Sequence, residues 1–281
     1  MVTTDFHSAI EGATSMLGHL GRVRATSLVA DCGDFFEGSG NYRFGGGTIE
    51  RSLLAGLYDA LAPGNQGWPH HFAPDLHPMT VCAHAVDDAS RQPLFCRVRI
   101  FRIGGRRVAV TAAIGPDAFG DVPAPQRRGH RVTDPVRVVL LVHHHEADVW
   151  VLLSHSRFEN DLALAAEFPF LDVIFAGHCH SDHYTPELVG DTLVVKGGKL
   201  EAGYALAELV GAGGAGPHLH LPHRPHDPAD APRARRPTGC RPAGEAQRSA
   251  GADRRVLPPH RARPLPAPGR RRRPAPLRSR R

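Results

Sequence analysis

Seven side chains with oxygen or nitrogen donor atoms stand just after apolar segments of the chain. They are Asp5, His7, Asp34, Asn65, His155, His178 and His180. Carboxylate, amide and imidazole donors suit Zn, Mn or Fe. Seven ligands are too many for one tetrahedral ion, but they suit two ions that share a bridging carboxylate. Two such ions about 3.5–4 Å apart can clamp a phosphoryl group and lower the pKa of the water between them.

Apolar runs typical of buried strands precede most of these donors. Strands are predicted over Val2–Thr4, Ser27–Ala30, Val149–Leu153 and Asp172–Ala176, and a helix over Thr48–Leu61 precedes Asn65. The carboxyl ends of the strands of an open α/β sheet form its ligand crevice. Donors far apart in the sequence are therefore predicted to meet along one edge.

The remaining pattern predicts a layered α/β domain, because short apolar runs alternate with helix-like segments. Further helices are predicted over Ala9–Leu20, Val136–His145 and Glu159–Glu167, and further strands over Thr80–Val86, Thr192–Lys196 and Tyr204–Val210. Arg97–Ile103 and Arg106–Ile114 flank Gly104-Gly105. This arrangement predicts a hairpin with a two-residue turn.

The donor motifs resemble, in order, those of the calcineurin-like metallophosphoesterases. The motifs are Asp5-Phe6-His7, Gly33-Asp34, Gly64-Asn65, His155 after an apolar strand, and Gly177-His178-Cys179-His180. Each motif alone is weak, whereas five in order are specific. The segments Asp31–Gly38 and Phe168–His180 look most like the 5′-nucleotidase branch, and the resemblance covers roughly residues 2 to 210. It implies a four-layer α/β/β/α sandwich with the Gly104-Gly105 hairpin in its second sheet.

The resemblance also implies roles for the donors. Asp5, His7 and His180 would hold the first metal ion, Asp34 would bridge, and Asn65, His155 and His178 would hold the second. The implied activity is phosphoester hydrolysis with two divalent cations, with phosphomonoesters, nucleotides first, as substrates. Cys179 is expected to be buried and inert, because in an extended stretch its side chain would point away from its neighbours.

Composition changes sharply near Gly211. Residues 212–281 contain 17 Arg, four acidic residues and no aromatic residue. Such a segment cannot bury enough apolar surface to offset its chain entropy. The prediction is a metallophosphoesterase domain over residues 1–211, followed by a disordered, basic Arg/Pro-rich tail over residues 212–281. Without aromatic residues for base stacking, that tail would bind nucleic acid only non-specifically.

The sequence predicts no membrane partner. No apolar run approaches the length of a membrane span, and the first five residues show no leader peptide. The odd count of five cysteines, without regular spacing, argues against a disulfide framework. The expected location is cytoplasmic by default.

Two alternatives compete with the phosphoesterase interpretation. His178, His180, Asp182 and His183 have the HxHxDH spacing of metallo-β-lactamase-like hydrolases, although that assignment leaves Asp5 without a role. The other alternative is a non-catalytic metal-binding remnant with a basic, nucleic-acid-binding tail. The tract 143–145, three histidines at the end of a predicted helix, is interpreted as a solvated surface that suits the helix dipole.

Gln66 departs from the family pattern. The family usually has Gly-Asn-His-Glu, where the His acts on the leaving group or the phosphate, and here the run is Gly64-Asn65-Gln66-Gly67. A carboxamide cannot act as an acid. Loss of general acid catalysis typically costs about 10²–10⁴ in rate. Activity is therefore expected to be much reduced, unless His70 or His71 takes over this role.

We expect Gln66→His to raise the turnover of a nucleoside monophosphate, because an imidazole restores a group that can donate a proton to the leaving group. A full restoration would be a gain of about 10²–10⁴. Comparing kcat of the variant and the natural chain at saturating Mn²⁺ measures this. A variant no faster than the natural chain would show that Gln66 is not the deficit.

Overall fold

The computed structural model describes residues 1–133, 146–180, 185–200, 203–209 and 219–220. The chain divides into two compact units, Met1–Pro232 and Arg233–Arg281, and all described residues belong to the first. The predicted helix Val136–His145, the residues Asp182 and His183, and nearly all of the predicted tail lie outside the described residues. The domain boundary at residue 211 stays a prediction.

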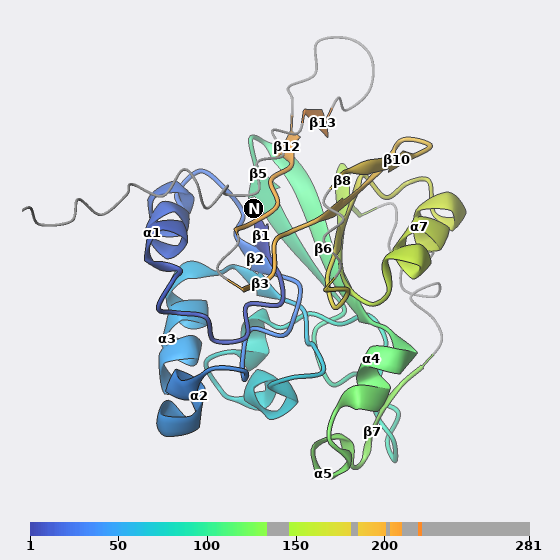
Figure 1. Cartoon of the computed structure of the whole chain (residues 1–281). Helices are drawn as coiled ribbons and strands as arrows, with labels where there is room; N and C mark the ends of the chain where they lie inside the picture. Colours follow the sequence, from blue (N-terminus) through green and yellow to red (C-terminus); the bar gives the residue numbers. More distant parts are fainter. Residues whose placement is uncertain (134–145, 181–184, 201–202, 210–218, 221–281) are drawn as a thin grey trace, which may run out of the picture. The chain divides into compact units, whose positions relative to one another are not determined.

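A small parallel sheet carries the first three donor loops. Its strands, in the order β1-β2-β3, are Val2–Thr3, Ala30–Asp31 and Ala60–Leu61. The helices α1 (Thr14–Val23) and α3 (Thr48–Leu57) lie beside this sheet (Figure 1). Met16 and Leu20 of α1 pack with Leu54 of α3 in one apolar cluster. α2 (Gly40–Gly45) precedes α3.

A larger sheet carries the remaining donors. Its six strands lie in the order β10-β11-β9-β8-β6-β5. Their bounds are β5 Val98–Ile103, β6 Arg106–Ile114, β8 Val149–His155, β9 Val173–Ala176, β10 Glu187–Val189 and β11 Thr192–Lys196. The four central strands are parallel, and the edge strands β5 and β10 pair antiparallel. The carboxyl ends of β8 and β9 therefore share one edge of the sheet.

The two sheets pack face to face between helices, which confirms the expected four-layer α/β/β/α sandwich. Alternate residues of β8 pack on opposite faces of the larger sheet. Val151 and Leu153 join Val2 and Ala30 of the small sheet in one buried cluster. Trp150 and Leu152 pack instead with residues of α7 (Phe158–Glu167), which covers the outer face of the larger sheet (Figure 1). Period-two alternation of this kind is what a strand buried on both faces requires.

Short elements complete the described chain. They are β4 (Ala85–Asp87), which pairs with β7 (His130–Val132), the short helices α4 (Pro116–Asp121) and α5 (Ala124–Arg127), the 3₁₀ helices Trp68–Phe72 and His77–Met79, and the pair β12 (Glu208–Leu209) and β13 (Leu219–His220). Among the described residues, no helix has the length and apolar character to cross a membrane.

The predicted hairpin is confirmed. β5 and β6 pair antiparallel in the larger sheet, and Gly104 and Gly105 have φ values of 56° and 83°. A two-residue turn with positive φ at both positions matches the twist of the flanking strands, and glycine adopts this conformation without steric cost.

The helix predicted over Thr48–Leu61 is too long. α3 ends at Leu57, and Tyr58 has extended backbone angles. The N–H of Val29 donates to the Asp59 carboxylate, which ties this segment to the strand β2. An apolar residue therefore stands at position 61 because Leu61 lies in the buried strand β3, not because it lies on a helix face. A short apolar run cannot be assigned to helix or strand by periodicity alone.

Other boundaries also shift. The helix predicted from Ala9 begins at Thr14, because the preceding residues form turns and Ser8 has a φ of 57°. The second strand starts at Ala30 rather than Ser27. The strand predicted over Thr80–Val86 is broken into isolated bridges and the short β4. In the predicted final strand, Ala205 bridges to Val2, and regular pairing is confined to β12.

A buried carboxyl group joins α7 to the end of β8. Asp161 is fully buried, and its Oδ1 accepts hydrogen bonds from the hydroxyl groups of Ser154 and Ser156, which flank His155. Its Oδ2 has no hydrogen-bond partner among the described residues. Burial raises the pKa of Asp161 to about 7, although the two hydroxyl groups oppose that rise.

Asp161→Asn should remove one pH dependence of stability. A carboxyl group with a raised folded-state pKa contributes stability that is fully present below its unfolded value near 4, and that contribution is lost as the pH rises through about 7. The free energy of unfolding of Asp161→Asn, relative to the natural chain, should therefore increase between pH 4 and pH 7. Urea unfolding in the presence of a chelator measures it.

The control for this measurement is Asp191→Asn, which alters an exposed residue in the turn between β10 and β11. Its free energy of unfolding should follow that of the natural chain at every pH. A constant difference between Asp161→Asn and the natural chain over this range would contradict a raised pKa of the Asp161 carboxyl group.

Candidate metal centre

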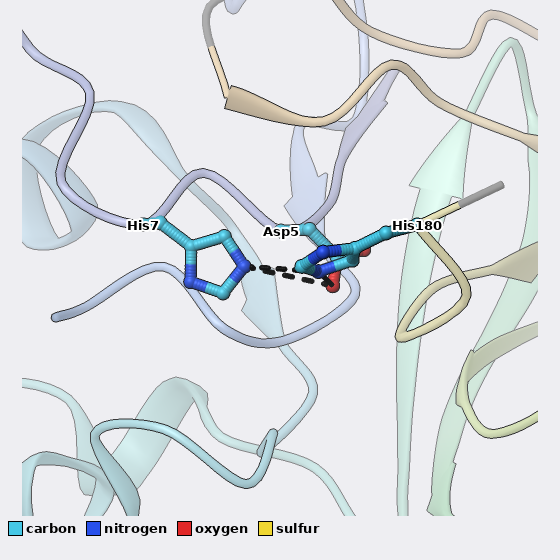
Figure 2. Close-up of side chains that lie close together, drawn as sticks. All are labelled: Asp5, His7 and His180. Atoms are coloured by element: carbon cyan, nitrogen blue, oxygen red, sulfur yellow. Dashed lines mark hydrogen bonds and ion pairs between the residues drawn. The ribbon is translucent and has the colours of Figure 1, made fainter. Parts of the chain in front are cut away.

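The first group of donors brings together residues from both sheets. Asp5 and His7 follow β1, whereas His180 follows β9. Nε2 of His180 lies 3.1 Å from Oδ1 of Asp5, and Nε2 of His7 lies 3.1 Å from Nε2 of His180 (Figure 2). One donor atom from each of the three residues lies within 4.8 Å of the others.

The second group has the same composition. Asp34 follows β2, His155 ends β8, and His178 follows β9, and their donor atoms also lie within 4.8 Å of one another. Nε2 of His155 is 3.3 Å from Oδ1 of Asp34 and 3.1 Å from Oδ1 of Asn65. Nδ1 of His155 is 2.7 Å from the carbonyl oxygen of Cys32, to which it can donate, so that Nε2 is left as the donor atom for a cation.

The backbone is unusual at four of these donors. Asp5, His7, Asp34 and His178 have φ values of 51°, 49°, 57° and 66°. Few residues other than glycine adopt this left-handed conformation, and aspartate and histidine are among those enriched there. The strain, of order 1–3 kcal/mol per residue, persists only where the surrounding structure fixes it. Such residues concentrate at functional sites, which supports a functional interpretation of these loops.

Glycines allow the donor loops to approach one another. A Cβ atom on Gly64 would overlap the Asp34 carboxylate, and one on Gly177 would overlap the Thr4 hydroxyl group. A Cβ atom on Gly33 would lie 2.7 Å from Nδ1 of His155. Each of these glycines directly precedes a predicted ligand in the sequence, so the Gly-ligand pairs were an available signal for this close approach.

Backbone hydrogen bonds lock the loops together. The N–H of His7 donates to the carbonyl oxygen of Asp34 at 2.9 Å, and the N–H of Asp5 donates to that of Gly33 at 3.0 Å. The N–H of His178 donates to Oδ2 of Asp5 at 3.0 Å. The last bond links the two sheets, so the side chain of Asp5 is held from both sides of the sandwich.

Both carboxylates remain ionised in this buried environment. Burial alone would raise the pKa of Asp5, but the hydrogen bond from His180, the charge of His155 and the hydroxyl group of Thr4 together hold it well below its usual range. For Asp34, burial also acts to raise the pKa, and His155 outweighs it. Thr4 was not foreseen from the sequence.

The histidines respond in opposite directions. Burial would lower the pKa of His155, but the carboxylates, Asp34 foremost, raise it to about 9. The hydrogen bond with Asp5 raises the pKa of His180. Burial, followed by the charge of His155, lowers the pKa of His178. The carboxylates of the site therefore favour positive charge beside them, which a bound cation or a protonated imidazole can supply.

The residues fit a pair of divalent cations. The donor set is limited to carboxylate, amide and imidazole groups, which suits Mn, Zn or Fe. Two imidazole nitrogens that face each other at 3.1 Å beside a carboxylate oxygen form the kind of cluster that a cation stabilises. Six of the seven sequence-predicted ligands form these two clusters, and the seventh, Asn65, contacts His155 of the second cluster. A bridging position for Asp34 stays a prediction.

The prediction that Cys179 is buried in an extended stretch is wrong. Cys179 is not fully buried but half-buried, and the stretch is not extended, because His178 has a left-handed backbone. His70 stacks on Phe36, and its Nε2 is 2.9 Å from the hydroxyl group of Tyr42. Nδ1 of His71 is 3.1 Å from Oγ1 of Thr80.

Gln66 lies against the first group, a contact that was not predicted. Its Oε1 is 2.6 Å from Nδ1 of His7, and its backbone N–H donates to Oδ1 of Asp34 at 2.8 Å. The histidine tract 143–145 and the alternative ligands Asp182 and His183 lie outside the part of the chain that the structure describes.

No protein-family model matches the chain, and no curated protein matches it in sequence. Solved structures do resemble it. The sulfate thiohydrolase SoxB from Thermus thermophilus shares 26% identity at a TM-score of 0.59, over 70% of this chain and 38% of that chain. A 5′-nucleotidase precursor, also from Thermus thermophilus, shares 22% identity at a TM-score of 0.58, over 74% of this chain and 50% of that one.

The calcineurin-like phosphoesterase YfkN from Bacillus subtilis shares 19% identity at a TM-score of 0.50, over 71% of this chain and 75% of that chain. These similarities confirm the resemblance in fold to calcineurin-like phosphoesterases and 5′-nucleotidases. The chain spans half or less of the length of the SoxB and 5′-nucleotidase structures.

Gly64→Ala should weaken cation binding, because the new Cβ atom would displace the Asp34 carboxylate. A displaced ligand should cost at least the 10–100-fold in affinity that is typical for loss of a supporting contact. Isothermal titration with Mn²⁺ measures this effect. Gly56→Ala, in α3 with no atom near its new Cβ, is the matched control and should bind Mn²⁺ like the natural chain. Equal affinities for both variants would contradict a ligand role for Asp34.

Proposed function

We propose that this chain is a two-metal-dependent phosphoester hydrolase that acts on phosphomonoesters, with nucleotides as the preferred candidates. The observation that carries the proposal is the convergence of two equivalent Asp/His/His groups at the carboxyl edges of two packed sheets. The similarity in fold to 5′-nucleotidases and to a calcineurin-like phosphoesterase supports the same reaction class.

The ligand assignment follows the two groups. Asp5, His7 and His180 would hold one cation. Asp34, His155 and His178, together with the amide oxygen of Asn65, would hold the other. Asp34 is the proposed bridge by resemblance to the family pattern, and its loop lies beside the first group, because its carbonyl oxygen accepts from the N–H of His7. Mn, Zn or Fe are the proposed metals.

A pair of divalent cations supplies electrostatic stabilisation of the transferred phosphoryl group and lowers the pKa of the attacking water. The chain's own contribution is to hold the donor atoms in fixed directions. Thr4 donates to Oδ2 of Asp5 at 2.6 Å, and Cys32 fixes the ring of His155 through its carbonyl oxygen. Such supporting contacts orient ligands and tune their basicity.

Proton donation to the leaving group is the weak point of this site. Gln66 occupies the position that a histidine takes in the family pattern, and its side chain lies against His7. A carboxamide cannot act as an acid. Substrates whose leaving group departs without protonation, such as aryl phosphates, should therefore react much faster than alkyl phosphates or nucleoside monophosphates.

The remaining assignments belong to the same proposal. The chain spans half of the 5′-nucleotidase precursor it resembles, so nucleotide specificity rests on analogy with that protein. The basic residues 212–281 would contact nucleic acid only non-specifically, through charge. A cytoplasmic location is proposed by default.

Hydrolysis should depend on added metal. We expect the chelator-treated full chain to be inactive toward p-nitrophenyl phosphate, and Mn²⁺ to restore turnover. Asp34→Asn should lower kcat on the order of 10–100-fold, because it removes a ligand charge, whereas the exposed control Asp191→Asn should leave kcat unchanged. Phosphate release is the measurement. Nucleoside monophosphates are assayed in parallel by phosphate release, and an S-sulfonate by sulfate release, since one similar structure is a sulfate thiohydrolase.

Two results would overturn the proposal. One is turnover that is equal with and without metal. The other is a natural chain that binds Mn²⁺ yet releases no phosphate from any phosphoester, which would favour the non-catalytic metal-binding alternative.

A further inference from the structure

We propose that Gln66 is a positioning residue for the first cation, because its amide oxygen holds His7 in the tautomer that can bind metal. The inference rests on the proposed function and deepens it. The family pattern shows only that an acid is missing at residue 66. The inference gives Gln66 a role of its own.

The geometry at His7 supports this role. Nδ1 of His7 faces Oε1 of Gln66 at 2.6 Å, whereas Nε2 faces Nε2 of His180 at 3.1 Å and Oδ1 of Asp5 at 4.0 Å. Figure 2 shows that one ring nitrogen of His7 is directed toward Asp5 and His180 while the other points away. The ring thus lies between an amide on one side and the proposed cation ligands on the other.

Tautomer chemistry then fixes the direction of the hydrogen bond. A neutral imidazole carries one proton, and the other nitrogen is an acceptor or a metal ligand. If Nε2 of His7 binds a cation, the proton must be on Nδ1. Nδ1–H then donates to the amide oxygen of Gln66, as Nδ1 of His155 can donate to the carbonyl oxygen of Cys32 in the second group. Both groups would therefore contain a histidine with an oxygen acceptor behind it.

The backbone of Gln66 is fixed independently of its side chain. Its N–H donates to Oδ1 of Asp34 at 2.8 Å, and the next N–H, of Gly67, donates to Oε1 of Glu37 at 3.0 Å. Gly67 has a φ of 74°, and a Cβ atom there would lie 2.6 Å from Phe36. The loop therefore presents the Gln66 side chain to His7 from a rigid position, and residue 66 contacts both groups at once.

This arrangement also explains why Gln66 is a poor replacement for an acid. A side chain engaged with His7 at 2.6 Å is not available to a leaving group. Loss of the acceptor should therefore appear first in cation affinity rather than in proton transfer. A Gln66→His variant does not separate the two effects, because an imidazole could both accept from His7 and donate to a substrate.

The test uses the full chain and Mn²⁺. Gln66→Met keeps the length of the side chain but removes the acceptor, whereas Gln66→Glu keeps an acceptor oxygen. Isothermal titration calorimetry should show one of two binding events weakened about 10–100-fold in Gln66→Met. In Gln66→Glu it should be as tight as in the natural chain or tighter. Gln92→Met, at an exposed residue before β5, is the matched control and should bind like the natural chain.

A spectroscopic measurement reports the tautomer directly. In the Zn²⁺-loaded natural chain, ¹⁵N-resolved NMR of the His7 ring should show a protonated Nδ1 that exchanges slowly with solvent. In Gln66→Met that proton should exchange faster, while the ring signals of His155, which is held by a carbonyl oxygen, stay unchanged. A general loss of structure would change both rings.

Three outcomes would reject the inference. Gln66→Met could bind both cations as tightly as the natural chain, Gln66→Glu could lose as much affinity as Gln66→Met, or Nδ1 of His7 could carry no proton. If instead the natural chain binds no cation, the proposed function itself fails. If the natural chain binds two cations and the variants do not differ, only the role of Gln66 fails.

Discussion

The candidate metal centre depends on a close approach between the carboxyl edges of two sheets. Donor atoms at the ends of β1 and β2 must come within a few ångströms of donors at the ends of β8 and β9. Gly64 and Gly177 make this possible, because the loops pass where a Cβ atom would overlap Asp34 or Thr4. The apolar contact between the sheets fixes their separation, and the glycines let the polar ends meet across it.

The close approach of the two sheet edges also requires that two buried carboxylates be stabilised in their charged form. Two carboxylates, Asp5 and Asp34, lie buried at one edge and keep their charge, because hydrogen bonds and neighbouring imidazoles offset the cost of burial. Without a cation, His155 provides positive charge, and its pKa rises to about 9. Isolated buried carboxylates would take up protons instead. The hydrogen bonds from Thr4 and from the backbone of His178 keep Asp5 directed into the site.

Most of the predictions that the structure confirms rest on local patterns in the sequence. β11 has its predicted bounds, and β8 and β9 differ by two residues or fewer, because long apolar stretches have few alternatives. The seven donors could be found because each lies within a few residues of the end of a predicted strand or directly after a glycine. Leu61 could not be assigned, since one apolar residue suits a helix face and a strand equally. The contact between Gln66 and His7 was beyond prediction, because it joins residues 59 positions apart through a rigid loop.

The origin of the donors has a mechanical consequence. Each group takes ligands from both sheets: His180 joins Asp5 and His7 across the sandwich, and Asp34 meets His155 and His178 in the same way. A bound ion would thus cross-link two sheets that otherwise contact each other mainly through apolar packing. Because ligand binding adds to the stability of the state that binds it, the lifetime of the folded chain would follow the supply of metal in its surroundings. When metal is scarce, the donor loops at the edge of the two sheets would then become less stable before the apolar core does.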